Sequence, residues 1–169
     1  MFIIQKELSP EAKVFLRVLK RKMGSVPPHF EFFATVNFKR FKMFIDEISY
    51  IANHPNISSD FFTFIRYYIS TNNGFDYCVS LNSNTLLEQG YSKTDLQNAL
   101  NNQILPLEEK FTTLFTKTIK AIEKPQYFCK DDLQELYKLG FSDIDIWDSI
   151  DHAAFLFKFY KLLNAYKKA

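Results

Sequence analysis

The feature that most constrains this 169-residue chain is the spacing of its apolar side chains, which recur every three or four positions along most of the sequence. That spacing places the apolar side chains on one face of an α-helix. No alternating apolar and polar run flanked by hairpin turns is found, so strands are not expected. Val26-Pro27-Pro28 predicts a rigid connector, because proline disrupts a helix interior. The sequence therefore predicts an all-α helical bundle, with helices at about residues 10–23, 38–52, 61–72, 75–89, 107–124 and 143–169.

Two stretches of the sequence share one pattern of helix-ending and helix-starting residues. Residues 90–96 read Gly-Tyr-Ser-Lys-Thr-Asp-Leu, and residues 140–146 read Gly-Phe-Ser-Asp-Ile-Asp-Ile. In each stretch the glycine is expected to end one helix in a left-handed conformation. The serine is then expected to cap the next helix, together with the aspartate three residues later. The pattern predicts two helix corners of the same design, which arose by internal duplication or by convergent capping chemistry.

The composition predicts one globular domain spanning residues 1–169. The chain is 47% hydrophobic and 17% aromatic, which supplies enough apolar surface for a core. Its net charge is +2, and its basic residues form no stripe interleaved with aromatics, so nucleic-acid binding is not expected. Two cysteines are too few for a secreted disulfide framework. No signal peptide or membrane-spanning stretch is recognised, so the expected location is the cytoplasm and no membrane partner is expected.

The C-terminal segment from Asp143 onward is apolar on more than one face. Ala153 to Phe157 alone covers more than one helical turn. A helix that is hydrophobic all round is buried, either at the centre of its own domain or in a subunit interface. We expect a homo-oligomer, either a dimer or a trimer, with this helix in or near the interface. Burial within a single domain is the alternative.

A short stretch at residues 72–78, Asn-Asn-Gly-Phe-Asp-Tyr-Cys, opens the predicted helix at 75–89. On that helix Phe75, Cys78 and Asn82 share one face, because they lie three and four residues apart. The stretch resembles the active-site motif of the alkylhydroperoxidase D-like, or carboxymuconolactone decarboxylase, family.

The resemblance extends to most of the chain and favours the peroxidase-related branch of that family. It implies a single-domain, all-α bundle of the alkylhydroperoxidase D-like type that is commonly homo-oligomeric. Similar stretches lie at residues 24–27, 86–90 and 139–143, within a region of resemblance at about 24–165.

The redox members of this family carry a glutamate, a Cys-x-x-Cys pair and a histidine. The matching positions in this chain are Thr63 for the glutamate, Phe75 and Cys78 for the two cysteines, and Asn82 for the histidine. Tyr77 keeps a tyrosine that is often found between the cysteines. The family's chemistry needs two thiols, because one attacks the oxidant and the other resolves the product as a disulfide. Asparagine carries no proton near neutral pH and threonine is not a carboxylate. The resemblance therefore implies a degenerate active site.

Cys78 is the candidate catalytic residue that remains. It is expected either as a small buried hydrophobe or as a reactive thiol in the first turn of a helix. The helix dipole favours the thiolate there, whereas the adjacent Asp76 opposes it. Cys129, which precedes two aspartates, is expected to have a structural role.

The three histidines show no metal-ligand spacing. His29, His54 and His152 are therefore expected in loops or on helix surfaces. Trp147 is expected in the core. Neither a metal site nor a cofactor site is predicted.

The predicted function is that of an alkylhydroperoxidase D-like protein that has lost dithiol peroxidase activity and uses the scaffold as a small-molecule-binding or interaction module. The alternative is a one-cysteine peroxidase or reductase with an antioxidant role, which uses Cys78 and an external thiol. The sequence leaves open whether the chain is an enzyme, and it identifies neither a substrate nor a reductant.

Overall fold

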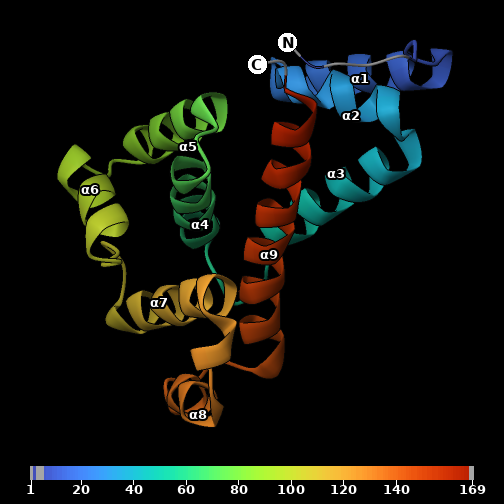
Figure 1. The fold of residues 1–169 in the computed structure, drawn as a ribbon. Helices are drawn as coiled ribbons and strands as arrows, with labels where there is room; N and C mark the ends of the chain where they lie inside the picture. The colour runs from blue at the N-terminus through green and yellow to red at the C-terminus, as the bar shows by residue number, and fades with distance from the viewer. Residues whose placement is uncertain (1, 3–5, 168–169) are drawn as a thin grey trace. The chain divides into compact units, whose positions relative to one another are not determined.

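The computed structural model describes residue 2 and residues 6–167. Over these residues the chain is all-α and forms no β-sheet (Figure 1), so the predicted fold class is confirmed. None of the helices in this described part is both long and apolar enough to cross a membrane. The elements are α1 (Pro10–Met23), α2 (Pro28–Val36), α3 (Phe38–Ala52), α4 (Ser59–Asn72), α5 (Asp76–Glu88), α6 (Lys93–Asn101), α7 (Glu109–Glu123), the 3-10 helix η1 (Pro125–Tyr127), α8 (Lys130–Lys138) and α9 (Asp143–Tyr166).

The chain divides into two compact units. The first unit comprises Met1–Tyr50 with Lys161–Ala169, and the second comprises Ile51–Tyr160. Helices α3 and α9 each contribute residues to both units. Each unit has an aromatic core of its own, and the expectation of one domain over residues 1–169 stays a prediction.

The first unit is held together by phenylalanines of α2 and α3. The Phe30 ring centroid lies 5.3 Å from that of Phe41 and 5.5 Å from that of Phe44, in edge-to-face arrangements that favour aromatic pairs. Helix α2 was not predicted. The expected connector ends at Pro27, and Pro28 is the first residue of α2. Proline is favourable at that position because the first helical N–H has no acceptor within the helix.

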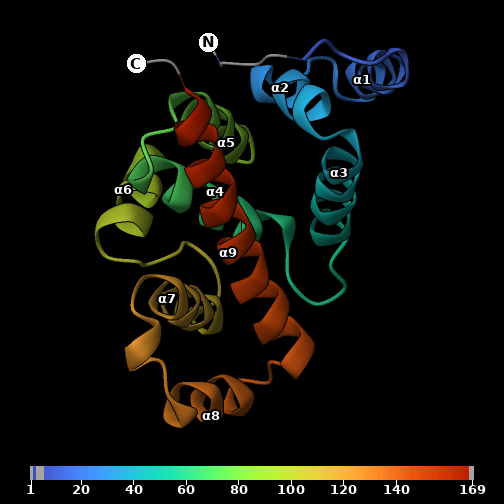
Figure 2. The ribbon, with the colours of Figure 1, turned by 45° about the vertical axis from the view of Figure 1, so that its right-hand side comes forward.

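Helix α4 lies at the centre of the second unit. The side chains of Phe61, Phe62, Phe64 and Ile65 are all fully buried. Helix α4 packs against α5, α6 and α7 (Figures 1 and 2). Burial of each such side chain contributes about 1.5–3 kcal/mol. This helix therefore provides the main hydrophobic element of the second unit and a fixed frame for the side chains it carries.

Both predicted helix corners are confirmed. Gly90 and Gly140 have φ values of 97° and 89°, in the left-handed region. The residue after each glycine donates its backbone N–H to a carbonyl of the preceding helix, at 3.1 and 3.2 Å respectively. Ser92 and Ser142 then cap α6 and α9, because each hydroxyl accepts the N–H of the aspartate three residues later, at 3.1 and 3.2 Å. Each of those aspartates accepts the serine N–H in return, at 2.8 Å.

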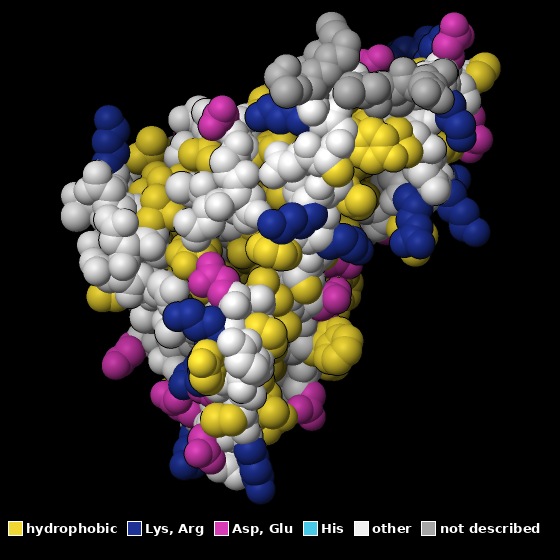
Figure 3. Space-filling view, viewed as in Figure 1, with side chains coloured by type: hydrophobic (Ala, Val, Ile, Leu, Met, Phe, Trp, Pro, Cys, Tyr) yellow, Lys and Arg dark blue, Asp and Glu magenta, His cyan; other side chains and the backbone are white. Residues whose placement is uncertain are grey.

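Helix α9 differs from the prediction in the faces that it buries. Trp147, which was expected in the core, is 70% exposed, and Ile144 one turn earlier is 62% exposed. Ala153 and Leu156 are buried, whereas Ala154 is exposed. The prediction for Trp147 is wrong because a helix that is apolar on several faces does not reveal which face packs inward. Figure 3 shows apolar side chains at the surface along the part of α9 that belongs to the second unit.

Candidate functional site

The turn between α4 and α5 sets the position of the candidate site. Gly74 has a φ of 65°, and its N–H donates to the Thr71 carbonyl at 3.2 Å. The N–H of Phe75 donates to the Ser70 carbonyl at 3.0 Å. This hydrogen-bond pair ends α4 and leaves Phe75 as the N-terminal flanking residue of α5. The predicted start of this helix near Phe75 is confirmed, and Cys78 lies in its first turn.

Cys78 is buried next to Tyr160 of α9. Burial raises the pKa of the Cys78 thiol, and the Tyr160 hydroxyl lowers it by a smaller amount by acting as a hydrogen-bond donor. Burial and the neighbouring Cys78 also raise the pKa of Tyr160. Both groups are therefore protonated near neutral pH.

The two positions that flank Cys78 on its helix face carry groups without redox chemistry. Phe75 is buried, and its ring centroid lies 5.3 Å from that of Tyr160. Asn82 is also buried, and its Nδ2 donates to the backbone carbonyl of Cys78 at 2.8 Å. One N–H of the Asn82 amide is thus bonded to the backbone. Tyr77, between the two motif positions, is 37% exposed.

Thr63, at the position that the resemblance assigns to the glutamate, is hydrogen-bonded to Arg66. The Thr63 hydroxyl is buried, donates to the Ser59 carbonyl at 2.8 Å and accepts from Nη2 of Arg66 at 2.6 Å. Burial lowers the pKa of Arg66 to about 10, and Tyr160 acts in the opposite direction. Arg66 is still a cation at neutral pH.

Ser70 connects Arg66 with Tyr160. Its hydroxyl is fully buried and lies 2.6 Å from the carbonyl oxygen of Arg66, to which it donates. Its oxygen keeps the capacity to accept a hydrogen bond. The interaction of Ser70 with the Tyr160 hydroxyl lowers the pKa of the tyrosine, against the larger effect of burial.

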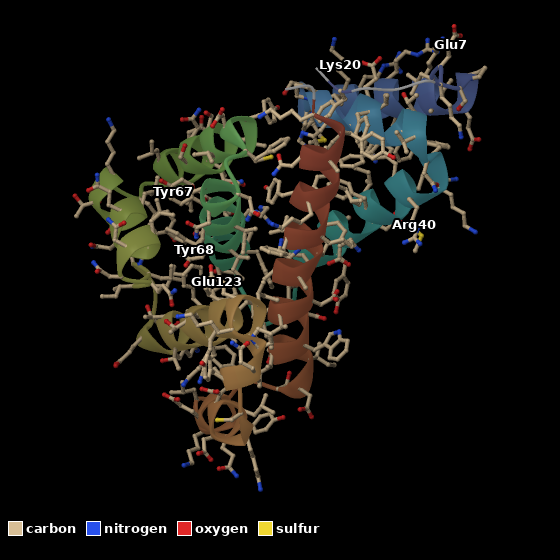
Figure 4. All side chains as sticks on the ribbon, viewed as in Figure 1. Glu7, Lys20, Arg40, Tyr67, Tyr68 and Glu123 are labelled. Atoms are coloured by element: carbon tan, nitrogen blue, oxygen red, sulfur yellow. The ribbon has the colours of Figure 1, made fainter. Side chains whose placement is uncertain are left out.

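We call this group the Cys78 cluster. Side chains of α4, α5 and α9 fill the space between these helices (Figure 4). The structure brings together four of the predicted site residues, either in side-chain contact or through the backbone, and adds three that the sequence did not indicate. The cluster consists of Thr63, Arg66, Ser70, Phe75, Cys78, Asn82 and Tyr160.

Of the three added residues, Arg66 and Ser70 could have been predicted from the sequence, and Tyr160 could not. Arg66 and Ser70 follow Thr63 at three and seven residues, so helical spacing alone places all three on one face of α4. That spacing is a usable signal. Tyr160 comes from a distant helix, and no local pattern links it to Cys78.

All three histidines are buried, and His29 and His152 lie in helices, so the expectation of a loop or a helix surface is wrong for these two. His29 lies within α2, where burial lowers its pKa to about 4. His152 is fully buried in α9, with its ring centroid 5.5 Å from that of Phe62. His54 does lie in a loop, but its side chain is also buried. The ring of His152 packs against Phe62 of α4, a contact between helices that sequence spacing does not reveal.

His54 holds the loop before α4 against the start of α9. Its Nδ1 accepts the backbone N–H groups of Asn56 and Ile57 at 3.2 and 3.1 Å. The proton of the neutral ring therefore lies on Nε2, which is 3.3 Å from Oδ2 of Asp148 and 3.8 Å from Oδ1 of Asp145. Asn56 also donates to Asp145 at 3.1 Å. The described residues contain no group of three or more histidine, cysteine or acidic side chains that could hold a metal ion, and we interpret this assembly as structural.

Comparisons with known proteins identify the fold. No protein-family model matches the sequence, and no curated protein matches it. Among solved structures, an uncharacterised peroxidase-related protein from Silicibacter sp. TM1040 is similar, with a TM-score of 0.82 and 18% identity over 98% of this chain and 89% of that one. An uncharacterised peroxidase-related protein from Ralstonia eutropha JMP134, described as an alkylhydroperoxidase AhpD core, is also similar, with a TM-score of 0.78 and 17% identity over 96% of this chain and 87% of that one. Identity at this level establishes a shared fold, and this chain has the all-α alkylhydroperoxidase D-like fold of peroxidase-related proteins.

Proposed function

We propose that this chain carries out no two-cysteine peroxidase cycle and instead binds a small molecule on an alkylhydroperoxidase D-like scaffold. One observation carries the proposal. Cys78 is a buried, protonated thiol, and the interacting side chain that affects its pKa is Tyr160, which is itself protonated. Phe75 supplies no second thiol, and Asn82 supplies no proton acceptor.

The chemistry of hydroperoxide reduction explains why this arrangement matters. A thiolate attacks the peroxide oxygen, the O–O bond breaks, an alcohol leaves and the sulfur becomes a sulfenic acid. A second thiol must then displace water from that sulfenic acid to form a disulfide, which an external dithiol reduces. The resemblance assigns Phe75 to the position from which the second thiol would act. Because its pKa is raised, only a small fraction of the Cys78 thiol is ionised at neutral pH to the thiolate that attacks the peroxide.

The second candidate is a one-cysteine thiol-dependent peroxidase or reductase with an antioxidant role. The observation that favours it is the Tyr160 hydroxyl, which can donate a hydrogen bond to the sulfur and stabilise a thiolate there. In this cycle an external thiol would attack the sulfenic acid of Cys78 and release water. A second external thiol would then reduce the mixed disulfide.

A hydroperoxide assay tests the proposal. We expect cumene hydroperoxide to be consumed no faster with the wild-type protein and dihydrolipoamide than with the Cys78→Ser variant. The Cys129→Ser variant is the matched control, because it removes the exposed cysteine and leaves the cluster intact. Turnover that is present in wild type and Cys129→Ser but lost in Cys78→Ser would contradict the proposal. A dependence on dihydrolipoamide alone would indicate the dithiol cycle, and equal support by glutathione would indicate the one-cysteine cycle.

A further inference from the structure

We infer that the outward face of α1, in the first unit, is a docking surface for a membrane that contains anionic lipids. This inference goes beyond the proposed function, because it concerns the first unit and uses no residue of the Cys78 cluster. The expectation of no membrane partner rested on the lack of a spanning stretch, and binding at a membrane surface requires no such stretch.

The charges of the chain separate between its two units. Residues 1–50 and 161–169 hold twelve lysines and arginines but five acidic residues, which is a net charge of +7. Residues 51–160 hold nine basic and fourteen acidic residues, which is a net charge of −5. The overall charge of +2 therefore conceals a strongly basic first unit, and this unit is the part of the chain that an anionic surface attracts.

Helix α1 packs against its own unit with one face only. Ala12 and Leu19 are buried on that face. The Phe15 ring lies edge-to-face against Phe38 and Phe41 of α3, with ring centroids 5.5 and 5.8 Å apart. The opposite face of α1 is therefore turned away from the core of the first unit.

The outward face of α1 interleaves arginines with valines. Val14, Arg17, Val18 and Arg21 are all exposed, and each lies three or four residues from two of the others, so they form one stripe. The two valines are 53% and 43% exposed. Exposed lysines flank the stripe at positions 13, 20 and 22, and Figure 4 shows Lys20. We call the stripe and these lysines the α1 basic face.

The cations of the α1 basic face form no ion pair with any other residue that the structure describes. The acidic residue of α1, Glu11, pairs with Lys42 of α3 at 3.7 Å. Nε of Arg17 donates to the Lys13 carbonyl at 3.4 Å, and the Arg17 side chain as a whole is exposed. The positive charge of this face is therefore directed towards solvent.

The exposed valines favour a membrane over other anionic partners. In a helix that lies at a membrane surface, apolar side chains enter the boundary between headgroups and acyl chains, while lysine and arginine attract anionic headgroups. Duplex nucleic acid is bound mainly through polar and charged side chains, and single strands stack on aromatic ones. The aromatic residue of α1, Phe15, packs inward. Alternating valine and arginine therefore fit a surface of anionic lipids.

Sedimentation with vesicles tests the partner. The probes are vesicles of phosphatidylcholine alone and vesicles of equal parts phosphatidylcholine and phosphatidylserine. We expect the full chain to bind the anionic vesicles at least about tenfold more tightly, since each lysine or arginine near an anionic surface strengthens binding about fivefold. Added salt should weaken this binding by screening the charges. Equal binding to both vesicles, or binding to neither, would overturn the inference.

Substitution of both arginines locates the surface. Arg17→Gln together with Arg21→Gln should weaken binding to the anionic vesicles at least about tenfold. Lys93→Gln together with Lys138→Gln is the matched control, because it removes two exposed cations from the second unit and leaves the same net charge. This control should bind as the wild type does. Equal losses in the two double variants would show an effect of net charge alone and would overturn the inference.

Substitution of both valines separates a membrane from other anionic partners. Val14→Ser together with Val18→Ser keeps every charge of the α1 basic face, and it should weaken binding to the anionic vesicles at least about fivefold through the loss of apolar burial. Circular dichroism checks that the helix content is unchanged. Unaltered binding of this variant would overturn the inference. So would tighter binding of the wild type to a DNA duplex or to polyglutamate, which would assign the face to nucleic acid or to an acidic protein.

Discussion

Nη2 of Arg66 donates a 2.6 Å hydrogen bond to the hydroxyl of Thr63. The resemblance assigns Thr63 to the position where redox members of the family carry a glutamate. A hydroxyl satisfies one donor of the guanidinium, whereas a carboxylate would also balance its charge. Thr63 therefore holds Arg66 by a hydrogen bond and supplies no carboxylate for proton transfer.

The capping serines of the two corners are expected to differ in their contribution to stability. Ser142→Ala should lower the free energy of unfolding by about 1 kcal/mol, and by more than Ser92→Ala does. Each serine hydroxyl also donates to its aspartate at 2.7 Å. Asp145 is buried, so water cannot replace the donor lost in Ser142→Ala, whereas Asp95 is not buried. Chemical denaturation of the two variants measures the difference. Equal losses would show that burial of Asp145 does not matter.

Asp132 is expected to make the free energy of unfolding depend on pH. Burial alone would raise the pKa of this carboxyl, but hydrogen bonds from Lys117, Lys120 and the Cys129 backbone N–H together lower it below the usual 3.8. The folded state therefore binds the proton less readily than the unfolded chain. The stabilisation is complete above the unfolded pKa of about 4, and it is lost as the pH falls from there through the lower pKa of the folded state.

Asp132→Asn tests this dependence. We expect it to lower the free energy of unfolding by about 2 kcal/mol at neutral pH, because it leaves two lysines without their buried partner. The difference from wild type should shrink as the pH is lowered below about 4. Asp131→Asn is the control at the neighbouring exposed position. If the difference in the free energy of unfolding between wild type and Asp132→Asn stays constant as the pH is lowered, the account is contradicted.

Restoration of the family motif is expected to create dithiol chemistry. Thr63→Glu, Phe75→Cys and Asn82→His together supply the missing groups, and the introduced cysteine lies three residues before Cys78 at the start of α5. We expect this triple variant to form an intramolecular disulfide on addition of hydroperoxide. The loss of Phe75 packing against Tyr160 should cost about 3 kcal/mol of stability. Mass spectrometry after thiol blocking detects the disulfide, with Phe75→Ser in the same background as the control. If both variants stay reduced, the assignment of the motif positions is wrong.

Oligomerisation stays a prediction, with a surface that can now be tested. Ile144 and Trp147 lie on one exposed face of α9, at 62% and 70% exposure, and exposed apolar residues of this size often mark an interface. We expect a homodimer or homotrimer in sedimentation equilibrium, and we expect Trp147→Lys to shift it towards the monomer. A wild-type protein that sediments as a 19.9 kDa monomer would contradict this expectation.

The helix boundaries that could be predicted best are those formed by side chains that bond to backbone groups a few residues away. The corners at Gly90 and Gly140 could be predicted because glycine, serine and aspartate act on backbone groups a few residues away. Helix α2 was missed because Val26-Pro27-Pro28 indicates a break whether or not a helix begins at Pro28. The orientation of α9 could not be predicted, because its apolar residues cover several faces.

The candidate site could be predicted only along single helices. Phe75, Cys78 and Asn82 share one helix face in the sequence and in the structure. The pairing of Cys78 with Tyr160 joins two helices that are distant along the chain, and it depends on tertiary packing, which local spacing does not encode. The burial of His54 and His152 was missed for the same reason.

The acidity of Cys78 tests the central claim most directly. In a Cys129→Ser protein, which leaves Cys78 as the only thiol, the rate of alkylation by iodoacetamide is followed against pH by mass spectrometry. Our account predicts that Cys78 titrates above the ordinary thiol value of 9.0 and is alkylated rapidly at neutral pH only after denaturation. Rapid alkylation of the folded protein at neutral pH, with a titration near or below pH 7, would show a reactive thiolate and contradict the account.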